Sequence, residues 1–285
     1  MERSVEAVYS TQLMKKMKAG FIGFMPYGDP NVDLYDLLES YGEIGYRGFE
    51  AGAMLLRGNP IENLKRVQGF GMQPLTLGYR IGGDNSVDEL IKNAKMLGID
   101  RVTTFVGVAG AYRFKDILEA PTYDDVMREI EEIEGVAKRL AEEGIIFAFH
   151  NHDVEFDMAF KGVPLLYLML AHSEHLKIEL DVGWVKYAGR DPAVVMKDIG
   201  NRICALHIKD ITDGTVIDEK PNGPVTMPQF TTPGTGLLNM KDCLSVGVEL
   251  GIEWAIVEQD FQYNISQKET LTAAYLNMKE TGLVE

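Results

Sequence analysis

The stretch RLAEEGIIFAFHNHDVE, from Arg139 to Glu155, contains one complete unit of the pattern that decides the fold. The unit consists of the end of a helix, a turn at Gly144, the apolar run Ile145–Phe149 and a polar segment. A glycine at this position can adopt the left-handed conformation that ends a helix. A short apolar run rich in β-branched and aromatic residues is typical of a parallel strand buried on both faces. The stretch therefore predicts a buried strand that follows a helix and ends in polar side chains.

The same unit recurs from about Lys18 to the end of the chain, and glycine returns at the helix-to-strand junctions Gly45, Gly71, Gly98 and Gly251. We expect strands at Gly20–Phe24, Gly48–Ala51, Gln73–Leu77, Arg101–Phe105, Ile145–Phe149, Leu176–Leu180, Ile203–Ile208 and Trp254–Val257. We expect helices at Leu34–Tyr41, Ile61–Phe70, Val87–Leu97, Tyr123–Glu143, Val163–Ala171, Pro192–Ile199, Met240–Leu250 and Lys268–Glu280. This alternation predicts parallel strands joined by right-handed crossovers.

Eight strands over about 250 residues predict an α/β fold, a single (β/α)8 TIM barrel that occupies residues 1–285 as one domain. Val5–Met17 is expected to form a short extra helix that closes the lower mouth of the barrel. A doubly wound sheet would carry a glycine-rich phosphate turn after its first strand. The segment Gly20–Gly23 does not have that pattern, and no Pro/Ser-rich linker divides the chain.

Composition narrows the class of protein. The 285 residues are 46% hydrophobic and 25% charged, and no apolar run is long enough to cross a bilayer. Met1 to Gly20 shows no export signal, which predicts a cytoplasmic location. Cys204 and Cys243 are too few for a disulfide framework and are expected to be reduced. The net charge of −15 argues against nucleic acid as a partner.

Polar side chains follow four of the predicted strands, in the segments His150–Glu155, Leu180–Trp184, Leu206–Asp210 and Val257–Asp260. The carboxyl ends of parallel barrel strands meet at one face, so these segments are expected to converge on one metal site. Each residue also has a simpler interpretation. Glu258 could form a salt bridge across the barrel, His207 could be a satisfied core histidine, and Asp181 could cap a helix. The cap is less favoured, because Gly183-Trp184 separates Asp181 from the stronger helix start at Asp191-Pro192.

The segment after the fifth strand offers several candidates at once, namely His150, His152, Asp153 and Glu155. Two or three carboxylates with one neutral imidazole suit a divalent ion and leave positions open for a substrate. The expected cofactor is therefore one divalent ion, and Mn²⁺, Zn²⁺, Co²⁺ and Mg²⁺ all remain open.

These motifs resemble those of the xylose isomerase-like TIM-barrel superfamily, in its sugar phosphate isomerase/epimerase branch. The branch pattern HNH-x-x-EF, LDVGW-x-x-x-AG-x-DP, LH-x-KD and VEQD matches four segments in order, and the resemblance spans nearly the whole chain. In the superfamily a Glu, an Asp, a His and a second Glu hold the metal. The resemblance carries these roles over to Glu155, Asp181, His207 and Glu258. It also suggests a homo-oligomer. The superfamily includes AP endonucleases, but this acidic chain lacks their basic DNA-facing surface.

The resemblance also implies roles for residues around the metal. In a related group that acts on 3-keto-sugars and their glycosides, the histidine three residues before the glutamate is a base, which gives this role to His152. Lys209 is expected to hold a developing oxyanion, or else to pair with Asp210 or Asp181. His150 either shares the pocket or supports it. Trp184 stands where many superfamily epimerases have a histidine, which argues against a simple mechanism with two glutamates.

Three functions follow from this reading, all with a small carbohydrate as the partner. The first is a metal-dependent sugar or sugar phosphate isomerase or epimerase that works through an enediolate, with Glu155 and Glu258 as ligands at the reacting centre. The second is a lyase or hydratase that acts on 3-keto-sugars or their glycosides. The third is a non-catalytic sugar-binding barrel. Tyr79, Arg80 and Trp184 are expected to line the sugar pocket, and the stretch Thr212–Gly236 forms either a lid or an ordered connection.

Overall fold

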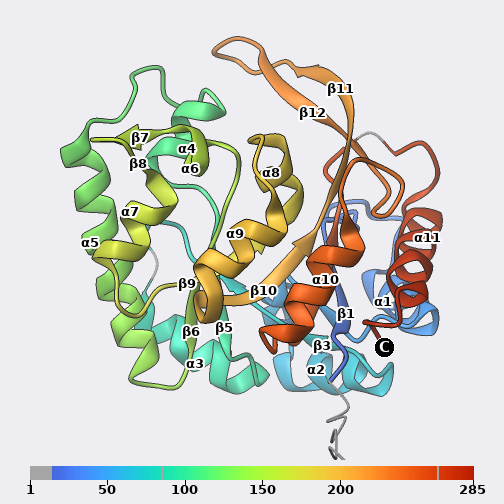
Figure 1. Cartoon of the computed structure of the whole chain (residues 1–285). Helices are drawn as coiled ribbons and strands as arrows, with labels where there is room; N and C mark the ends of the chain where they lie inside the picture. Colours follow the sequence, from blue (N-terminus) through green and yellow to red (C-terminus); the bar gives the residue numbers. More distant parts are fainter. Residues whose placement is uncertain (1–14, 85, 262) are drawn as a thin grey trace, which may run out of the picture.

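The computed structural model describes residues 15–84, 86–261 and 263–285. One curled sheet of parallel strands forms its centre, in the order β3-β2-β1-β13-β10-β9-β6-β5-β4 (Figure 1). Its strands are β1 (Lys18–Ile22), β2 (Gly48–Phe49), β3 (Gln73–Pro74), β4 (Leu77–Gly78), β5 (Arg101–Thr104), β6 (Ile146–His150), β9 (Lys177–Asp181), β10 (Ile203–Ile208) and β13 (Trp254–Glu258). All its strand pairs are parallel, as the alternating pattern predicts.

The two ends of the sheet, β3 and β4, are halves of one predicted strand, Gln73–Leu77, which is interrupted at Leu75 and Thr76. β3 pairs with β2, and β4 pairs with β5. The chain therefore passes from one edge of the sheet to the other within a few residues, and the sheet curls back on itself. The predicted barrel is confirmed, with its third strand split into two short pieces.

Helices surround the sheet in Figure 1 and match the eight that the periodicity predicts. They are α1 (Leu34–Ile44), α2 (Pro60–Gly69), α3 (Val87–Leu97), α5 (Tyr123–Ala141), α7 (Leu165–His172), α9 (Pro192–Ile199), α10 (Met240–Glu249) and α11 (Gln267–Glu280). Gly98 ends α3 with φ of +66°, the left-handed conformation expected at this junction. The extra helix predicted at Val5–Met17 lies almost wholly outside the described residues; Met17, which is described, forms a β-bridge with Val284.

Short elements fill the loops around the barrel. They are the 3-10 helices η1 (Gly52–Leu56) and η2 (Gly200–Arg202), the short helices α4 (Val108–Arg113), α6 (Val154–Asp157) and α8 (Val182–Tyr187), and the paired strands β7 (Ala159–Phe160) and β8 (Val163–Pro164). α8 begins directly after β9, and α6 begins four residues after β6. These two helices set the path of the chain beside the candidate site.

Thr212–Gly236 is mostly a β-hairpin rather than a plain connection. Its strands β11 (Asp210–Asp218) and β12 (Val225–Thr231) pair antiparallel and extend beyond the barrel near α8 in Figure 1. Asp210 fastens the base of the hairpin, because its carboxylate accepts hydrogen bonds from the backbone N–H groups of Gly234, Gly236 and Leu238. The hairpin is therefore an ordered arm whose inner face can pack against the barrel mouth.

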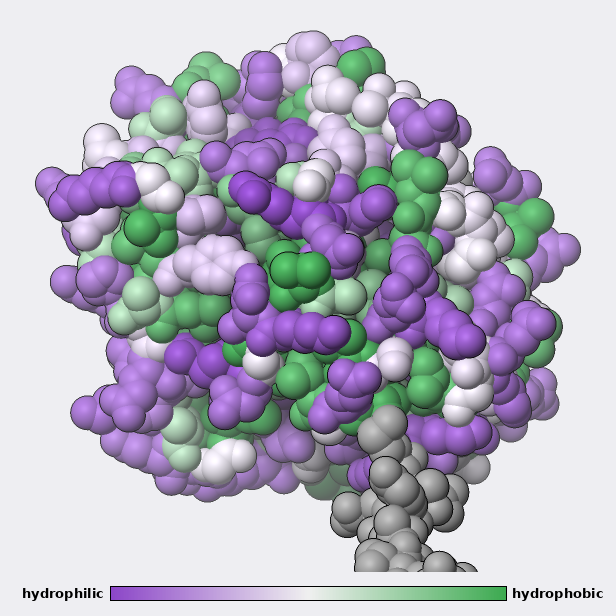
Figure 2. Space-filling view, viewed as in Figure 1, coloured by the Kyte–Doolittle hydropathy of each residue, from purple (hydrophilic) through white to green (hydrophobic). Residues whose placement is uncertain are grey.

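The buried hydrophobic side chains form one large core between sheet and helices, a small group of Leu75, Ala205, Trp254 and Ile256, and a cluster at the mouth of the barrel. The cluster at the mouth consists of Trp184, Ile211, Val225, Met227 and Phe230, so α8 and the hairpin pack together there. On the outer face in Figure 2, hydrophobic residues are interspersed among hydrophilic ones. Across the described part of the chain, every helix is too short or too polar to span a membrane.

Candidate metal centre

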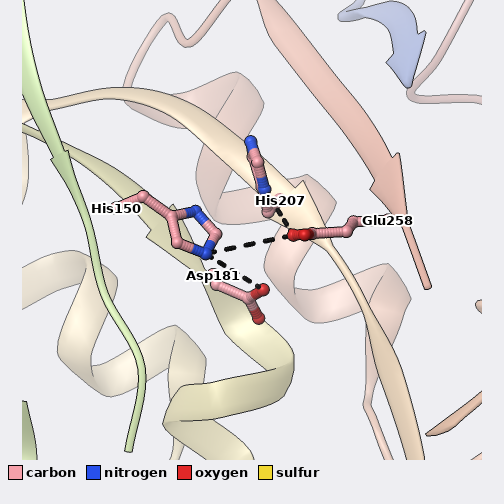
Figure 3. Close-up of side chains that lie close together, drawn as sticks. All are labelled: His150, Asp181, His207 and Glu258. Atoms are coloured by element: carbon pink, nitrogen blue, oxygen red, sulfur yellow. Dashed lines mark hydrogen bonds and ion pairs between the residues drawn. The ribbon is translucent and has the colours of Figure 1, made fainter. Parts of the chain in front are cut away.

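Four side chains from four neighbouring strands meet at the carboxyl ends of the barrel strands. His150 ends β6, Asp181 ends β9, Glu258 ends β13, and His207 is the last residue but one of β10. One ligand atom from each of them lies within 4.8 Å of the others. Figure 3 shows the four side chains directed toward one another. Barrel closure thus brings together residues that lie more than a hundred positions apart in the sequence.

The donor atoms of these four side chains lie close to one another. His150 Nε2 lies 3.9 Å from both Asp181 Oδ2 and Glu258 Oε2. His207 Nδ1 lies 2.7 Å from Glu258 Oε2. In the described structure, Asp181 Oδ2 is buried and has no hydrogen-bond partner, although a buried polar atom normally has one. Asp181 Oδ2 accepts no hydrogen bond from any described residue and lies near His150 Nε2 and the Lys209 ammonium group, which fits a site for positive charge.

The types of donor narrow the kind of ion. Two imidazole nitrogens and two carboxylate oxygens form a mixed set that suits Zn²⁺, Co²⁺ or Mn²⁺. Burial and the neighbouring His207 lower the pKa of His150 to about 3, so its imidazole is neutral and has a lone pair to offer. Glu258 stays ionised, because Lys209 and His207 outweigh the effect of burial and hold its pKa well below the usual value. The centre is therefore equipped to hold one divalent ion.

The two carboxylate oxygens of Asp181 face different groups. Its Oδ1 accepts a hydrogen bond of 2.9 Å from the Trp184 backbone N–H and caps α8, while Oδ2 faces the centre. The interpretation that disfavoured a helix cap here was wrong, because a short helix, α8, starts at Val182, and the expected helix start at Asp191-Pro192 is also present, as α9. The cap fixes the carboxylate plane, so the second oxygen points at the centre.

Lys209 supplies a positive charge beside the same carboxylates. Its Nζ lies 3.3 Å from Asp181 Oδ2, 3.2 Å from Glu258 Oε2 and 3.0 Å from Asp260 Oδ2. Burial opposes the charge on Lys209, but Asp260, Glu258 and Asp181 outweigh it and raise the pKa of the ammonium group. Of the two salt bridges considered for this lysine, the contact with Asp181 is present, whereas the carboxylate of Asp210 is used at the base of the hairpin.

Glu155 does not join the other three predicted ligands. Its carboxylate folds back, and Oε2 accepts a hydrogen bond of 2.6 Å from the His152 backbone N–H. Glu155 lies in α6, which turns the chain after Asp153, and burial raises its pKa to about 8. His150 lies in the centre instead, because β6 continues one residue beyond the predicted end at Phe149. The structure thus brings together Asp181, His207 and Glu258 and adds His150 as the fourth donor.

His152 lies directly beside the centre. Its ring packs against the rings of His150, Phe114 and Trp184, with centroid distances of 5.1, 5.0 and 5.2 Å. Burial, followed by the nearby His150, lowers the pKa of His152 well below its ordinary value. Its Nδ1 is buried and has no hydrogen-bond partner in the described structure. The residue is thus a neutral imidazole in a largely apolar cradle.

The residues predicted to bind substrate fall in two places. Trp184 is only 1% exposed, and its ring and that of Phe230 in the hairpin lie 5.5 and 5.2 Å from Lys209 Nζ, beside the centre. Tyr79 and Arg80 instead line a separate groove of about 1410 Å³ beside β4 and β5. The Tyr79 hydroxyl donates a hydrogen bond to Glu132 in that groove. Tyr79 and Arg80 are therefore not brought to the metal centre.

Sequence reasoning missed a buried charged group on the far side of His207, formed by Glu50, Arg101 and Glu179. Its strongest signal was Glu179, a charged residue between Ile178 and Leu180 in the middle of strand β9. Glu50 directly follows the short strand β2 and was included in the predicted strand Gly48–Ala51. A charge inside a strand buried on both faces needs a partner, and this rule could have identified the group.

Comparison with known proteins agrees with this architecture. An inosose dehydratase of Clostridium tetani is 25% identical over 161 residues, which cover 51% of this chain and 50% of that protein. The chain thus spans about half the length of the curated relatives it matches. A sugar phosphate isomerase/epimerase from Parabacteroides distasonis has a TM-score of 0.71 at 16% identity and covers 95% of this chain and 100% of its own. The zinc-bound IOLI protein has a TM-score of 0.68 at 16% identity and covers 93% of this chain and 98% of its own.

At these identities the two solved structures establish a shared fold. Residues 42–275 match the family described as xylose isomerase-like TIM barrel, which confirms the resemblance found in the motifs. Because this match covers most of the sequence, the chain belongs to the xylose isomerase-like TIM barrel family.

Proposed function

We propose that this protein is a divalent-metal-dependent lyase that removes water from a keto-sugar or a cyclic keto-polyol. The observation that carries the proposal is the pairing of a neutral imidazole, His152, with an ammonium group, Lys209, around one cluster of metal donors. Elimination next to a carbonyl needs one group that takes a proton from carbon and another that gives a proton to the departing hydroxyl. These two groups provide that combination.

His150, Asp181, His207 and Glu258 would hold the ion. A divalent ion bound there would polarise a substrate carbonyl and make the neighbouring C–H bond more acidic. Trp184 is buried and packs with the hairpin beside Lys209, so the reacting group would be shielded from bulk water. Only the carbonyl end of the carbohydrate would then have to reach the metal centre.

His152 would take the proton from the carbon next to the carbonyl. Its imidazole is neutral, its ring contacts the His150 ring, and its Nδ1 makes no hydrogen bond in the described structure. Glu155 would act through the backbone, because its carboxylate holds the His152 N–H and fixes the turn that carries the imidazole. We therefore assign Glu155 a positioning role in place of the ligand role that the resemblance implies.

Lys209 would give a proton to the hydroxyl that leaves from the next carbon. The hydroxyl then departs as water, a carbon–carbon double bond forms, and the proton taken by His152 returns to solvent. Asp260 contacts the Lys209 ammonium group at 3.0 Å, and its side chain is 30% exposed, so it connects the lysine with solvent. Asp260 can take up a proton from solvent and pass it to Lys209 after each turnover. The inosose dehydratases among the relatives support a reaction of this class.

A sugar isomerase or epimerase is the second candidate, and Asp260 is the observation that favours it. Asp260 is a partly exposed carboxylate that contacts Lys209, and it could serve as a second proton-transfer group for the same carbon. Two proton-transfer groups on opposite faces permit epimerisation without loss of water. The related sugar phosphate isomerase/epimerase structure is consistent with this alternative.

The test is to incubate the manganese-loaded protein with an inosose and with a 3-keto-glucoside in D₂O and to follow products by mass spectrometry. We expect a product that has lost one water. His152→Gln should lower the rate about 10²- to 10⁴-fold, whereas His172→Gln, on the exposed end of α7, should not change it. A product of unchanged formula that gains deuterium would instead support the isomerase or epimerase. Binding of either compound without product or exchange would contradict both and favour the non-catalytic barrel.

A further inference from the structure

A layer of charged side chains crosses the barrel interior directly beneath the metal centre. Glu50, Arg101, Glu179 and His207 are each at most 4% exposed and come from, or directly follow, four different strands. The interior of a TIM barrel is usually filled by branched apolar side chains. Replacing part of that filling with ions costs free energy unless every charge is paired. A buried layer of this kind therefore points to a specific task.

Arg101 holds both carboxylates but cannot balance them. Its Nη2 lies 2.9 Å from Glu50 Oε1, and its Nε lies 3.1 Å from Glu179 Oε1. With both carboxylates ionised, the two carboxylates and one guanidinium carry one net negative charge. The other oxygen of each carboxylate faces His207 Nε2, at 3.1 Å for Glu50 and 3.3 Å for Glu179. The imidazole is therefore hydrogen-bonded to Glu50 and lies within ion-pair distance of Glu179.

A second metal ion is a poor explanation of this layer, even though Glu50, Glu179 and His207 lie close enough to hold one. The Arg101 guanidinium already occupies the space beside both carboxylates, and a cation placed there would be repelled. His207 Nε2 lies 3.1 Å from Glu50 Oε2, and a proton on this nitrogen would leave no lone pair on that side. The opposite ring nitrogen, Nδ1, faces Glu258 and the metal centre.

We infer that Glu50 and Glu179, held by Arg101, are positioning residues that keep the Nε2 proton on His207 and so present Nδ1 to the metal ion. This inference rests on the metal centre of the proposed function. Carboxylates that accept a hydrogen bond from a metal-bound imidazole fix its orientation and make it a stronger ligand. The excess negative charge beneath the ring also favours a cation above it. His150 has no such support, since its Nδ1 lacks a hydrogen-bond partner in the described structure.

The first test is a competition titration of zinc against a chromophoric chelator, with the parent protein and the Glu50→Gln and Glu179→Gln variants. Glutamine keeps the size and an acceptor oxygen but removes the charge. We expect each variant to bind zinc about 10- to 100-fold more weakly. Glu129→Gln is the matched control, because Glu129 is a buried glutamate that bonds to the Val108 backbone N–H away from the centre. Its affinity for zinc should equal that of the parent.

The second test needs no variant of Glu50 or Glu179, so it stands even if those variants do not fold. ¹⁵N-histidine NMR should show His207 with zinc on Nδ1 and a proton on Nε2, and His207→Gln identifies the signal by its loss. Zinc on Nε2, or variants that bind zinc as tightly as the parent, would overturn the inference and leave the metal centre intact. A parent protein that binds no zinc, cobalt or manganese would overturn the proposed function as well.

Discussion

Individual side chains at this centre carry out two tasks with two different atoms. Asp181 caps α8 with one oxygen and faces the donors with the other, and His207 faces carboxylates on both sides of its ring. A side chain that is held at one atom loses rotamer freedom before any ligand binds, so less entropy remains to be lost on binding. The centre is therefore organised in advance by hydrogen bonds that lie outside it.

The buried carboxyl group of Glu129 predicts a pH-dependent stability that is separate from the metal centre. Burial, opposed by the Val108 N–H and reinforced by Glu132, raises its pKa from 4.5 to about 7. Because the folded state holds this proton more tightly than the unfolded state, the stabilisation is complete below about pH 4.5 and is lost as pH rises through about 7. The total loss is at most about 3 kcal/mol.

Glu129→Gln removes this titration while keeping an acceptor for the Val108 N–H. We expect the free energy of unfolding of the variant, relative to the parent, to rise by up to about 3 kcal/mol between pH 5 and pH 8. Urea denaturation of both proteins across this range measures the difference, and the contributions of other titrating groups cancel in it. Parallel curves for the two proteins would show that Glu129 ionises normally.

At the scale of elements, close packing of α8 against the chain that leaves β10 depends on Gly183. A Cβ atom at this position would lie 2.5 Å from the Lys209 backbone oxygen. Gly183→Ala must therefore push α8 away from Lys209, and we expect a loss of about 1–3 kcal/mol in stability. The same substitution at Gly135, in the interior of α5 where a Cβ atom meets nothing within 4 Å, should instead stabilise the protein by about 0.5–1 kcal/mol.

Thermal unfolding of the two glycine variants beside the parent measures both effects. We expect the highest Tm for Gly135→Ala, an intermediate Tm for the parent and the lowest Tm for Gly183→Ala. A Gly183→Ala protein as stable as the parent would show that α8 can move away from Lys209 without loss of stability. This result would contradict the close packing of α8 beside the metal centre.

Regular elements were predictable from the sequence because each repeats a strong local signal. The glycine junctions and apolar runs located the barrel strands and their helices to within a few residues. The hairpin was missed, although Thr215, Val216 and Ile217 precede a turn at Asn222-Gly223, because the stretch was interpreted from its Gly, Pro and Thr content. The hairpin packs against Trp184, and no local sequence pattern indicates this tertiary contact.

The sequence predicted the location of the candidate site more accurately than the side chains that form it. Strand residues alternate between two faces, so His150 and Ala148 point the same way on β6, as do Asp181 and Glu179 on β9. Whether His150 or Glu155 reaches the centre depends on where β6 stops and α6 begins. The sequence signals for that boundary are weak, because polar residues fill the whole segment.

At the scale of the whole molecule, the metal centre is a consequence of barrel topology. β6, β9, β10 and β13 are neighbours in the sheet, and their ends carry all four donors. An ion held there would bind only the folded chain, so it should stabilise the entire barrel by about 2.7 kcal/mol when its free concentration is 100 times Kd. The centre thus links metal binding to global stability.

The most direct test of this account is the zinc and manganese stoichiometry of the purified protein, His150→Ala and Glu155→Gln, measured by plasma mass spectrometry after equal exposure to each ion and removal of the excess. We expect the parent and Glu155→Gln to retain about one equivalent and His150→Ala to retain little, because His150, and not Glu155, lies among the donors. Loss of the ion in Glu155→Gln with retention in His150→Ala would contradict the four-residue centre described here.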